Sequence, residues 1–430
     1  MEKEKEHTSL GLNLEDYLYE AQNCTGQRAC LFIDLNYLQG TDFSFRCPVW
    51  QKEQLSAYGA MGKCKLTSDL LTGKIDFSNP TIREIAFKDL MCGSCDAACK
   101  RNLDLEPLLL IESLRAKLVE LGYGPLPEHK PISDNIEKSN NRYGQDQNKR
   151  MDWLPSSVKP VPKADILYFA GCRACFKNTE IAAATANIFT AAKAEFMVLP
   201  DEPCCGHYLS TTGQIEKARK IFEKNLQLIR ETGAKTVVFS CADCFKTIKV
   251  DYPKLLGFST FDLGFEVKHI TEMADEWVQA GRLQLDKRVD MKVTYTDACN
   301  LGRMSDPWIP WEGTRGHFGR LNPPRTVRRG LHGVYEPPRD LLKAIPGIEL
   351  VEMVRHHENA WCCGNHGGVK EAYPEFSVWT ASERLREAAT TGAEAIITAC
   401  SGCKENFTDA SQDGMKVYDI TEIMAMAIGK

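Results

Sequence analysis

The chain has 430 residues, enough for two or three domains, because a single hydrophobic core seldom grows beyond about 250–300 residues. Hydrophobic residues make up 43% of it, charged residues 26%, and the net charge is −5, which excludes the basic balance expected of a nucleic-acid-binding protein. The N-terminus has no signal-peptide pattern and no apolar run approaches the ~18–20 residues that span a bilayer, so we expect a cytoplasmic protein without a membrane span.

Eighteen cysteines are the unusual feature of the composition. Disulfide frameworks belong mainly to secreted chains shorter than this one, so metal ligation is the leading explanation in a reducing compartment. Zinc prefers four ligands in a closed tetrahedron, an arrangement that adjacent Cys-Cys pairs fit poorly. Iron-sulfur clusters bind thiolates at several irons and tolerate such crowding better.

Residues 1–125 carry seven cysteines. The segment MCGSCDAACKRNLDLEPLLLIESLRAKLVELG and the Cys47-Pro48 pair resemble the two halves of an α-helical ferredoxin domain, which implies a mainly helical fold. The sequence departs from that pattern at Asp89, where a cysteine is expected, and at Lys100, where a proline is expected. The resemblance implies one [4Fe-4S] cubane, and a second if Asp89 or another non-cysteine group supplies the missing ligand. The expected metal ligands are Cys24, Cys30, Cys47, Cys64, Cys92, Cys95 and Cys99.

Two alternatives stay open for this first domain. CxxC pairs also serve structural zinc, so a zinc site competes with the iron-sulfur interpretation. Cys64 is either a displaced ligand or a buried cysteine that acts as a small hydrophobe.

Residues 126–163 are rich in Pro, Lys, Asn, Asp and Gln, a composition typical of a linker that wraps a surface. Tyr143 and Trp153 are the residues best suited to dock this linker.

The rest of the chain is a duplication. A first unit runs from ILYFAGC through PCCG to SCADC and closes with VKHITE, and a second runs from VTYTDAC through WCCG to ACSGC and closes with VYDITE. The intervals between cysteine groups are 31 and 35 residues in the first unit, and 62 and 36 in the second. This repeat predicts two copies of one domain, at residues 164–285 and 286–430. The extra residues of the 62-residue interval fall at about residues 304–331, as expected for an insertion in a surface loop.

The insertion is rich in tryptophan and arginine, which are favoured at binding hot spots. It is either a lid or docking surface for a partner or an anionic substrate, or a packed loop with solvated charges. Its candidate residues are Trp308, Trp311, Arg315, His317, Arg320, Arg325, Arg328 and Arg329.

The single cysteines and the CxxC pairs follow β-type runs, namely ILYFAG, TVVFS, VTYTDA and AIITA, with helical patterns between them. Alternation of strands and helices predicts an α/β fold with parallel sheets flanked by helices. Ligands of such sheets gather at the carboxyl ends of the strands. Cys172, Cys241, Cys299 and Cys400 fall at these ends.

Each adjacent cysteine pair is expected in a turn, where Gly206 or Gly364 gives backbone freedom and exposed N–H groups can hydrogen-bond to sulfur. His207 and His366 follow the two CCG triplets in the sequence. They are either proton donors or hydrogen-bond partners of the site, or histidines of a surface loop. Cys175 has no counterpart in the second unit and is expected in the core. Five thiolates exceed the four that a cubane takes, so either one is spare or the cluster is unusual.

The spacing C-x31-CC-x35-CxxC, with Gly after the pair, resembles the cysteine-rich CCG domain of heterodisulfide reductase catalytic subunits and their relatives. Those relatives include subunits of glycolate, lactate and glycerol-3-phosphate dehydrogenases and of benzoyl-CoA reductase complexes. The resemblance implies two noncubane [4Fe-4S] clusters, each held by five cysteines. The two sets are Cys172, Cys204, Cys205, Cys241 and Cys244, and Cys299, Cys362, Cys363, Cys400 and Cys403.

The same resemblance implies a function. The chain is expected to be an iron-sulfur electron-transfer subunit of a soluble oxidoreductase, passing electrons from the N-terminal cubane region through the paired clusters to a disulfide or related acceptor. His207 and His366 are the expected acid-base residues. The expected partners are a flavoprotein of the heterodisulfide reductase A type and other electron-transfer subunits. The alternative is a pure relay subunit of a benzoyl-CoA reductase or a quinone-linked glycolate or lactate dehydrogenase type of complex.

Overall fold

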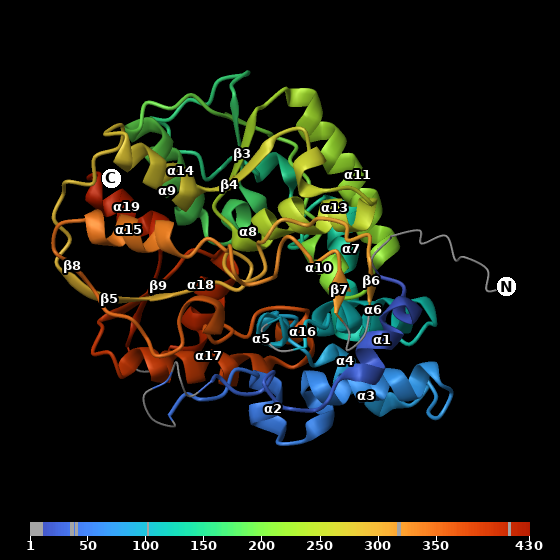
Figure 1. Ribbon diagram of the computed structural model, residues 1–430. Coiled ribbons are helices and arrows are strands. Elements are labelled where there is room, and N and C mark those ends of the chain that lie inside the picture. The colour runs from blue at the N-terminus through green and yellow to red at the C-terminus, as the bar shows by residue number, and fades with distance from the viewer. Residues whose placement is uncertain (1–11, 35–37, 39–41, 101–102, 316–319, 412–413) are drawn as a thin grey trace.

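Two four-stranded parallel sheets form the frame of the protein (Figure 1), in a computed structural model that describes residues 12–34, 38, 42–100, 103–315, 320–411 and 414–430. Strand order is β2-β1-β3-β4 in the first sheet and β8-β5-β9-β10 in the second, so both sequence units have one topology. The predicted α/β fold with two parallel sheets is confirmed. The strands are β1 Ile166–Phe169, β2 Met197–Val198, β3 Thr236–Phe239, β4 Glu266–His269, β5 Met291–Thr296, β8 Ile348–Leu350, β9 Ala395–Thr398 and β10 Lys416–Asp419.

Helices cover the sheets because the central strands are apolar on both faces and must be buried on both. The pattern is clearest in α11, where Ala218, Phe222, Leu226 and Ile229 form one buried face and Gly233 ends the helix at a φ of 72°. The α-helices are α8 Gly171–Phe176, α9 Thr179–Ala191, α10 His207–Thr211, α11 Ile215–Thr232, α12 Ala242–Lys246, α13 Tyr252–Leu256, α14 Ile270–Gln279, α15 Glu336–Ala344, α16 Val369–Ala372, α17 Pro374–Ala389, α18 Ser401–Ala410 and α19 Ile420–Ala427.

The two modules contact each other through equivalent helices. Helix α9 of the first module packs against α19 of the second, and α15 of the second packs against α14 of the first. In each pair, the helix before the second strand of one module meets the last helix of the other. The modules are therefore related by a pseudo-two-fold arrangement, like the isologous interface of a homodimer.

The motifs that close the two units, HITE and DITE, are helix caps. The side chains of His269 and Asp419 accept hydrogen bonds from the backbone N–H groups of Thr271 and Thr421, at the starts of α14 and α19. In each motif the glutamate accepts the backbone N–H of the capping residue, which completes a capping box.

Substituting Asp419 with asparagine should change the pH dependence of stability. Burial raises the pKa of Asp419 to about 7, from an ordinary value of 3.8. The folded protein therefore holds a proton on Asp419 more tightly than the unfolded chain does. The contribution of this proton to the stability of the fold is fully present below about pH 4 and is lost as the pH rises through 7. Asparagine caps helices equally well but cannot ionise. Asp419→Asn should raise the melting temperature more at pH 8 than at pH 5, measured by scanning calorimetry, and an equal change at both pH values would contradict this account.

The N-terminal cysteine-rich domain is helical, as predicted, and its helices lie along one side of the two modules (Figure 1). Helix α3 is central to it, with α1 and α6 packed against it. Phe32 and Phe45 form an isolated antiparallel bridge in the connection before α2. The helices are α1 Leu18–Asn23, α2 Pro48–Glu53, α3 Ala60–Leu71, α4 Pro80–Phe87, α5 Ser94–Cys99 and α6 Pro107–Glu120, preceded by a 3-10 turn at Leu14–Tyr17.

The expected linker lies against the first module. It contains helix α7, Lys130–Ser139, and the buried side chain of Trp153, whose ring centroid lies 5.8 Å from that of Tyr168 on β1. Arg150 is buried too and pairs with Glu202.

The insertion in the second module reaches the N-terminal domain. It contains the short antiparallel strands β6, Thr314–Arg315, and β7, Leu321–Asn322. Three of its arginines pair with acidic residues of the N-terminal domain, so their charge is satisfied within the chain, whereas His317 lies outside the described residues. The pairs are Arg315 with Glu20, Arg325 with Glu106, and Arg329 with Asp96.

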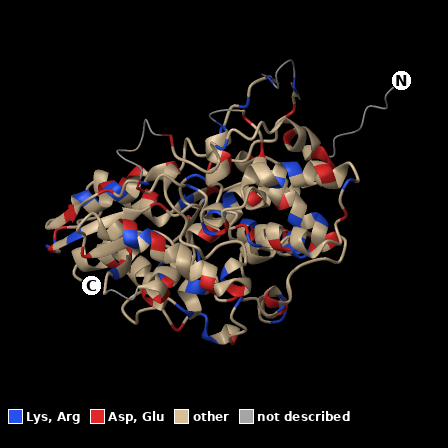
Figure 2. Ribbon diagram, turned by 90° about the horizontal axis from the view of Figure 1, so that it is seen from below, with Lys and Arg blue, Asp and Glu red and all other residues tan. Residues whose placement is uncertain are grey.

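Charges of both signs are interspersed over the ribbon (Figure 2). Within the described ranges, none of the helices has the length and apolar character that crossing a bilayer requires.

Candidate iron-sulfur sites

The first five cysteines of the repeat, here called the first quintet, converge at the carboxyl ends of β1 and β3. Cys172 lies in α8 directly after β1, the Cys204-Cys205 pair precedes α10, and Cys241 and Cys244 lie at the start of α12. All five are buried. Their thiols form a hydrogen-bonded series in the order Cys172, Cys204, Cys205, Cys244, Cys241, with 3.4 Å between the sulfurs of Cys205 and Cys244.

The second quintet repeats this arrangement. Its buried thiols are connected in the order Cys299, Cys362, Cys363, Cys403, Cys400, at the carboxyl ends of β5 and β9. The structure therefore brings together each predicted set of five. Hydrogen bonds from neighbouring thiols lower the pKa of Cys205 to about 6 and that of Cys363 well below its ordinary value. Within each adjacent pair, the second cysteine is thus more readily ionised than the first to a thiolate, the form that binds metal.

Glycines leave room for the sulfurs and supply donors to them. Gly171 has a φ of 80°, and a Cβ there would lie 2.8 Å from the Cys244 sulfur. Gly206 and Gly364 have φ values of 83° and 88°, which favour glycine. Their N–H groups donate to the sulfurs of Cys204 and Cys362 at 3.5 and 3.4 Å. These buried sulfurs with backbone donors fit an iron-sulfur cluster.

The two quintets touch each other. The thiols of Cys241 and Cys400 are hydrogen-bonded across the module interface, and the Ser401 hydroxyl donates to the Cys241 sulfur at 3.3 Å. The spacing of cysteines along the chain contains no signal for this contact, because it depends on how the modules pack.

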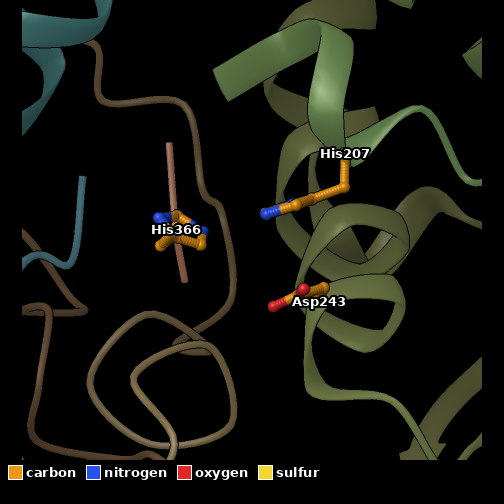
Figure 3. Close-up of side chains that lie close together, drawn as sticks. All are labelled: His207, Asp243 and His366. Carbon is orange, nitrogen blue, oxygen red and sulfur yellow. The ribbon is translucent and has the colours of Figure 1, made fainter. Parts of the chain in front are cut away.

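A buried polar cluster lies at this interface. We call it the junction cluster; it consists of His207, Asp243, Asn300 and His366. The side chains of both histidines and Asp243 approach a common space (Figure 3), with one ligand atom from each within 4.8 Å of the others. The two imidazole ring centroids are 4.8 Å apart. Two histidines and a carboxylate are also ligand types that divalent transition metals accept.

Hydrogen bonds orient the junction cluster. His366 Nδ1 lies 2.7 Å from the Leu90 carbonyl and so carries the proton, which leaves Nε2 to accept from the Asn300 amide at 3.0 Å. The same amide donates to Asp243 at 2.8 Å. The buried Oδ1 of Asn300 has no protein partner among the described residues. His207 Nδ1 lies 2.8 Å from the Thr247 hydroxyl, and burial lowers the pKa of His207 to about 3.

Sequence reasoning missed Asp243 and Asn300. The available signal was a difference between the repeats: Asp243 lies inside SCADC where the second unit has Gly402, and Asn300 follows Cys299 where the first unit has Arg173. A Cβ on Gly402 would lie 3.3 Å from Asp243, so the smaller residue makes room for the carboxylate of the other module.

Each quintet has a buried arginine beside it, with different partners. Arg150, near Cys172, pairs with the carboxylate of Glu202. In the second unit Ala360 replaces Glu202, and Arg303, near Cys299 and Cys362, donates instead to backbone carbonyls. Cys175 is buried near Arg150, which acts electrostatically on it.

The N-terminal cysteines reach the second module. The thiols of Cys92 and Cys362 are hydrogen-bonded, which lowers the pKa of Cys92 to about 6. Arg303 Nε donates to the Cys92 carbonyl at 2.7 Å and Nη1 donates to the Ala360 carbonyl at 2.6 Å. The N-terminal domain is thus joined to the second quintet by both a thiol contact and a buried arginine.

Known proteins show the same features. The cysteine-rich domain family named CCG matches residues 166–249 and 325–408. The D subunit of dihydromethanophenazine:CoB--CoM heterodisulfide reductase from Methanosarcina acetivorans is 34% identical over 393 residues, covering 88% of this chain and 86% of that protein. The B subunit of fumarate reductase (CoM/CoB) from Methanothermobacter marburgensis is 28% identical over 340 residues, covering 78% of this chain and 60% of that protein. EtfAB:quinone oxidoreductase of Syntrophomonas wolfei is 25% identical over 364 residues, covering 78% and 46%.

The matches agree with the repeat. The first matched range includes the whole first quintet, and the second includes four cysteines of the second quintet, with Cys299 ahead of it because the insertion lies between. The similarity to the heterodisulfide reductase protein extends well beyond the matched modules. The chain therefore belongs to the family of heterodisulfide reductase D subunits and is an iron-sulfur electron-transfer subunit of an oxidoreductase.

Proposed function

We propose that the chain reduces a disulfide, or a related two-electron acceptor, at the junction of its modules. The contact between Cys241 and Cys400 carries this proposal, because it brings the quintets together beside the junction cluster. Each quintet would hold one noncubane [4Fe-4S] cluster through five thiolates, and the N-terminal domain would hold one or two further clusters. Two adjacent one-electron centres match a reaction that consumes two electrons.

The reaction breaks one S–S bond, takes up two electrons and two protons, and releases two thiols. His366 Nε2, which accepts from the Asn300 amide, would exchange this donor for a product S–H group, while the amide keeps its hydrogen bond to Asp243. When the Thr247 hydroxyl donates to His207 Nδ1, the imidazole proton lies on Nε2, from which it can reach a substrate sulfur. The Asn300 oxygen, which lacks a partner in the described part of the chain, offers a further acceptor to the substrate. The cysteine-bound iron would supply the electrons.

Electrons would enter from the N-terminal domain. The contact between Cys92 and Cys362 favours the second quintet as the first receiver, and the contact between Cys241 and Cys400 then leads to the first quintet. Backbone N–H donors such as Gly206 and Gly364 would tune the reduction potentials.

The donor in this proposal is a flavoprotein partner of the heterodisulfide reductase A type, within a hetero-oligomeric complex. The names of two relatives support the hetero-oligomeric complex, since both are named as subunits of larger enzymes. All eighteen cysteines are free, which fits the reducing cytoplasm that we propose as the location.

Substituting His207 or His366 with glutamine should slow disulfide reduction by about 10²-fold, the usual contribution of a positioned proton donor. Protein purified without oxygen and reduced chemically would be mixed with an asymmetric disulfide, and reoxidation would be followed by visible absorption. The exposed His332 provides the control, and His332→Gln should react like the parent. The proposal fails if the reduced parent protein is not reoxidised by disulfides.

The relay alternative has support from one relative, which is named as an EtfAB:quinone oxidoreductase. A relay without a substrate of its own would exchange electrons rapidly with a flavoprotein and leave disulfides unreacted. The same mixing experiment, run with a flavoprotein as the acceptor, distinguishes the two functions.

A further inference from the structure

The seven N-terminal cysteines divide into a group of four and a group of three. The thiols of Cys24 and Cys64 are hydrogen-bonded, and Cys30 and Cys99 lie close enough to act electrostatically on Cys64. The remaining three form the second group, in which Cys92 acts on both of its other members, Cys47 and Cys95, while Cys30 of the first group also lies close enough to act on Cys95.

Asp89 is already bound by other groups in the structure. Its Oδ2 pairs with the ammonium of Lys63 at 2.6 Å, and its Oδ1 accepts the backbone N–H of Met91 at 2.7 Å. Lys63 is fully buried and also donates to the Tyr58 carbonyl at 2.6 Å. Taking Asp89 as an iron ligand would disturb a buried ion pair, and breaking such a pair is strongly destabilising because it leaves a buried charge without its partner.

Helix α3 serves both groups. Lys63 and Cys64 are consecutive on it, and successive side chains of a helix point about 100° apart. The ammonium of Lys63 therefore faces Asp89 and Cys47 in the second group, whereas the buried thiol of Cys64 faces Cys24 in the first. An ammonium has no lone pair with which to bind iron. This one helix thus supplies a fourth thiol to the first group and holds the carboxylate of the second.

We propose that Cys24, Cys30, Cys64 and Cys99 bind a four-iron cubane, and that Cys47, Cys92 and Cys95 bind a three-iron [3Fe-4S] cluster, with Asp89 held away from iron by Lys63. This inference rests on the proposed iron-sulfur content of the N-terminal domain and specifies its ligands. The three-cysteine group is the one that contacts the second quintet, through Cys92 and Cys362. The three-iron cluster is therefore the centre that passes electrons to the modules.

The four-cysteine group is tested by replacing Cys64. Cys64→Ala should lower the iron content of anaerobically purified protein by at least about one atom per chain and remove one cubane signal from the EPR spectrum of the reduced protein, because the three remaining cysteines can hold at most a three-iron cluster. Cys175→Ala, at another buried cysteine, should lose no iron. Unchanged iron and EPR signals in Cys64→Ala overturn the assignment of Cys64.

The three-cysteine group is tested in the oxidised state, where three-iron clusters are paramagnetic and cubanes are not. The oxidised parent protein should show a three-iron EPR signal that Cys95→Ala abolishes. The double variant Lys63→Met/Asp89→Asn removes both charges together and should keep this signal. Lys63→Met/Asp89→Cys should gain about one iron and exchange the signal for a cubane signal in the reduced state.

The outcomes separate this inference from the function on which it rests. Loss of the oxidised-state signal in Lys63→Met/Asp89→Asn, with circular dichroism like that of the parent, would make Asp89 a ligand and overturn the three-iron assignment. Iron that responds to Cys205→Ala and Cys363→Ala but not to Cys64→Ala or Cys95→Ala would overturn this inference alone. Protein without any iron would overturn the proposed function as well.

Discussion

Cys363→Ala should remove about four iron atoms per chain and a large part of the visible absorption. Cys363 is buried in the middle of the second quintet, hydrogen-bonded to both Cys362 and Cys403, and it is the member whose pKa is lowered. Its loss removes the thiolate that connects the two halves of the set. Cys205→Ala should have the same effect in the first quintet, where Cys205 lies between Cys204 and Cys244.

The measurement is iron and sulfide analysis of protein prepared without oxygen, together with its absorption spectrum. Cys175→Ala is the matched control, because Cys175 is equally buried, lies near the first quintet and is predicted to bind nothing. Full iron content in Cys205→Ala and Cys363→Ala would disprove five-cysteine ligation in both modules.

Arg115→Met should lower the stability of the whole chain by at least about 3 kcal/mol, because several buried carbonyl groups would lose their donor. The guanidinium on α6 is fully buried and donates to five carbonyls, two of which belong to the modules: Thr211 at 2.6 Å and Gly367 at 2.8 Å. The other three belong to the N-terminal domain: Ala86, Phe87 and Asp89. One side chain therefore joins all three domains.

Thermal unfolding and limited proteolysis measure this effect. We expect a lower melting temperature and earlier cleavage between the N-terminal domain and the modules. Arg288→Met is the control, since Arg288 is exposed, pairs only with Asp290 among the described residues, and should leave the melting temperature unchanged. A parent-like melting temperature for Arg115→Met would show that the domains are held together by other contacts.

The duplication explains why the site lies where it does. Each module places five thiols at the carboxyl ends of its own strands, and the reciprocal contacts of α9 with α19 and of α14 with α15 turn these ends toward each other. The junction cluster draws on both modules, with His207 and Asp243 from the first and Asn300 and His366 from the second. A single module would supply only half of this arrangement.

Much of this could be predicted from local patterns in the sequence. The repeat, the order of cysteines within it and the apolar runs before Cys172, Cys241, Cys299 and Cys400 are sufficient to predict two parallel α/β modules with a thiol set each. These features are local because strand propensity, turn chemistry and spacing act over tens of residues. The HITE and DITE motifs are also local, and they fold as helix caps.

Tertiary structure alone decided how the sites meet. The contacts of Cys241 with Cys400 and of Cys92 with Cys362 join residues that are distant in the sequence, and so does the hydrogen bond between Asn300 and Asp243. The ion pair between Lys63 and Asp89 has no pattern in the sequence either. Such contacts arise from the packing of apolar helix faces against each other, and the sequence specifies each face but not its partner.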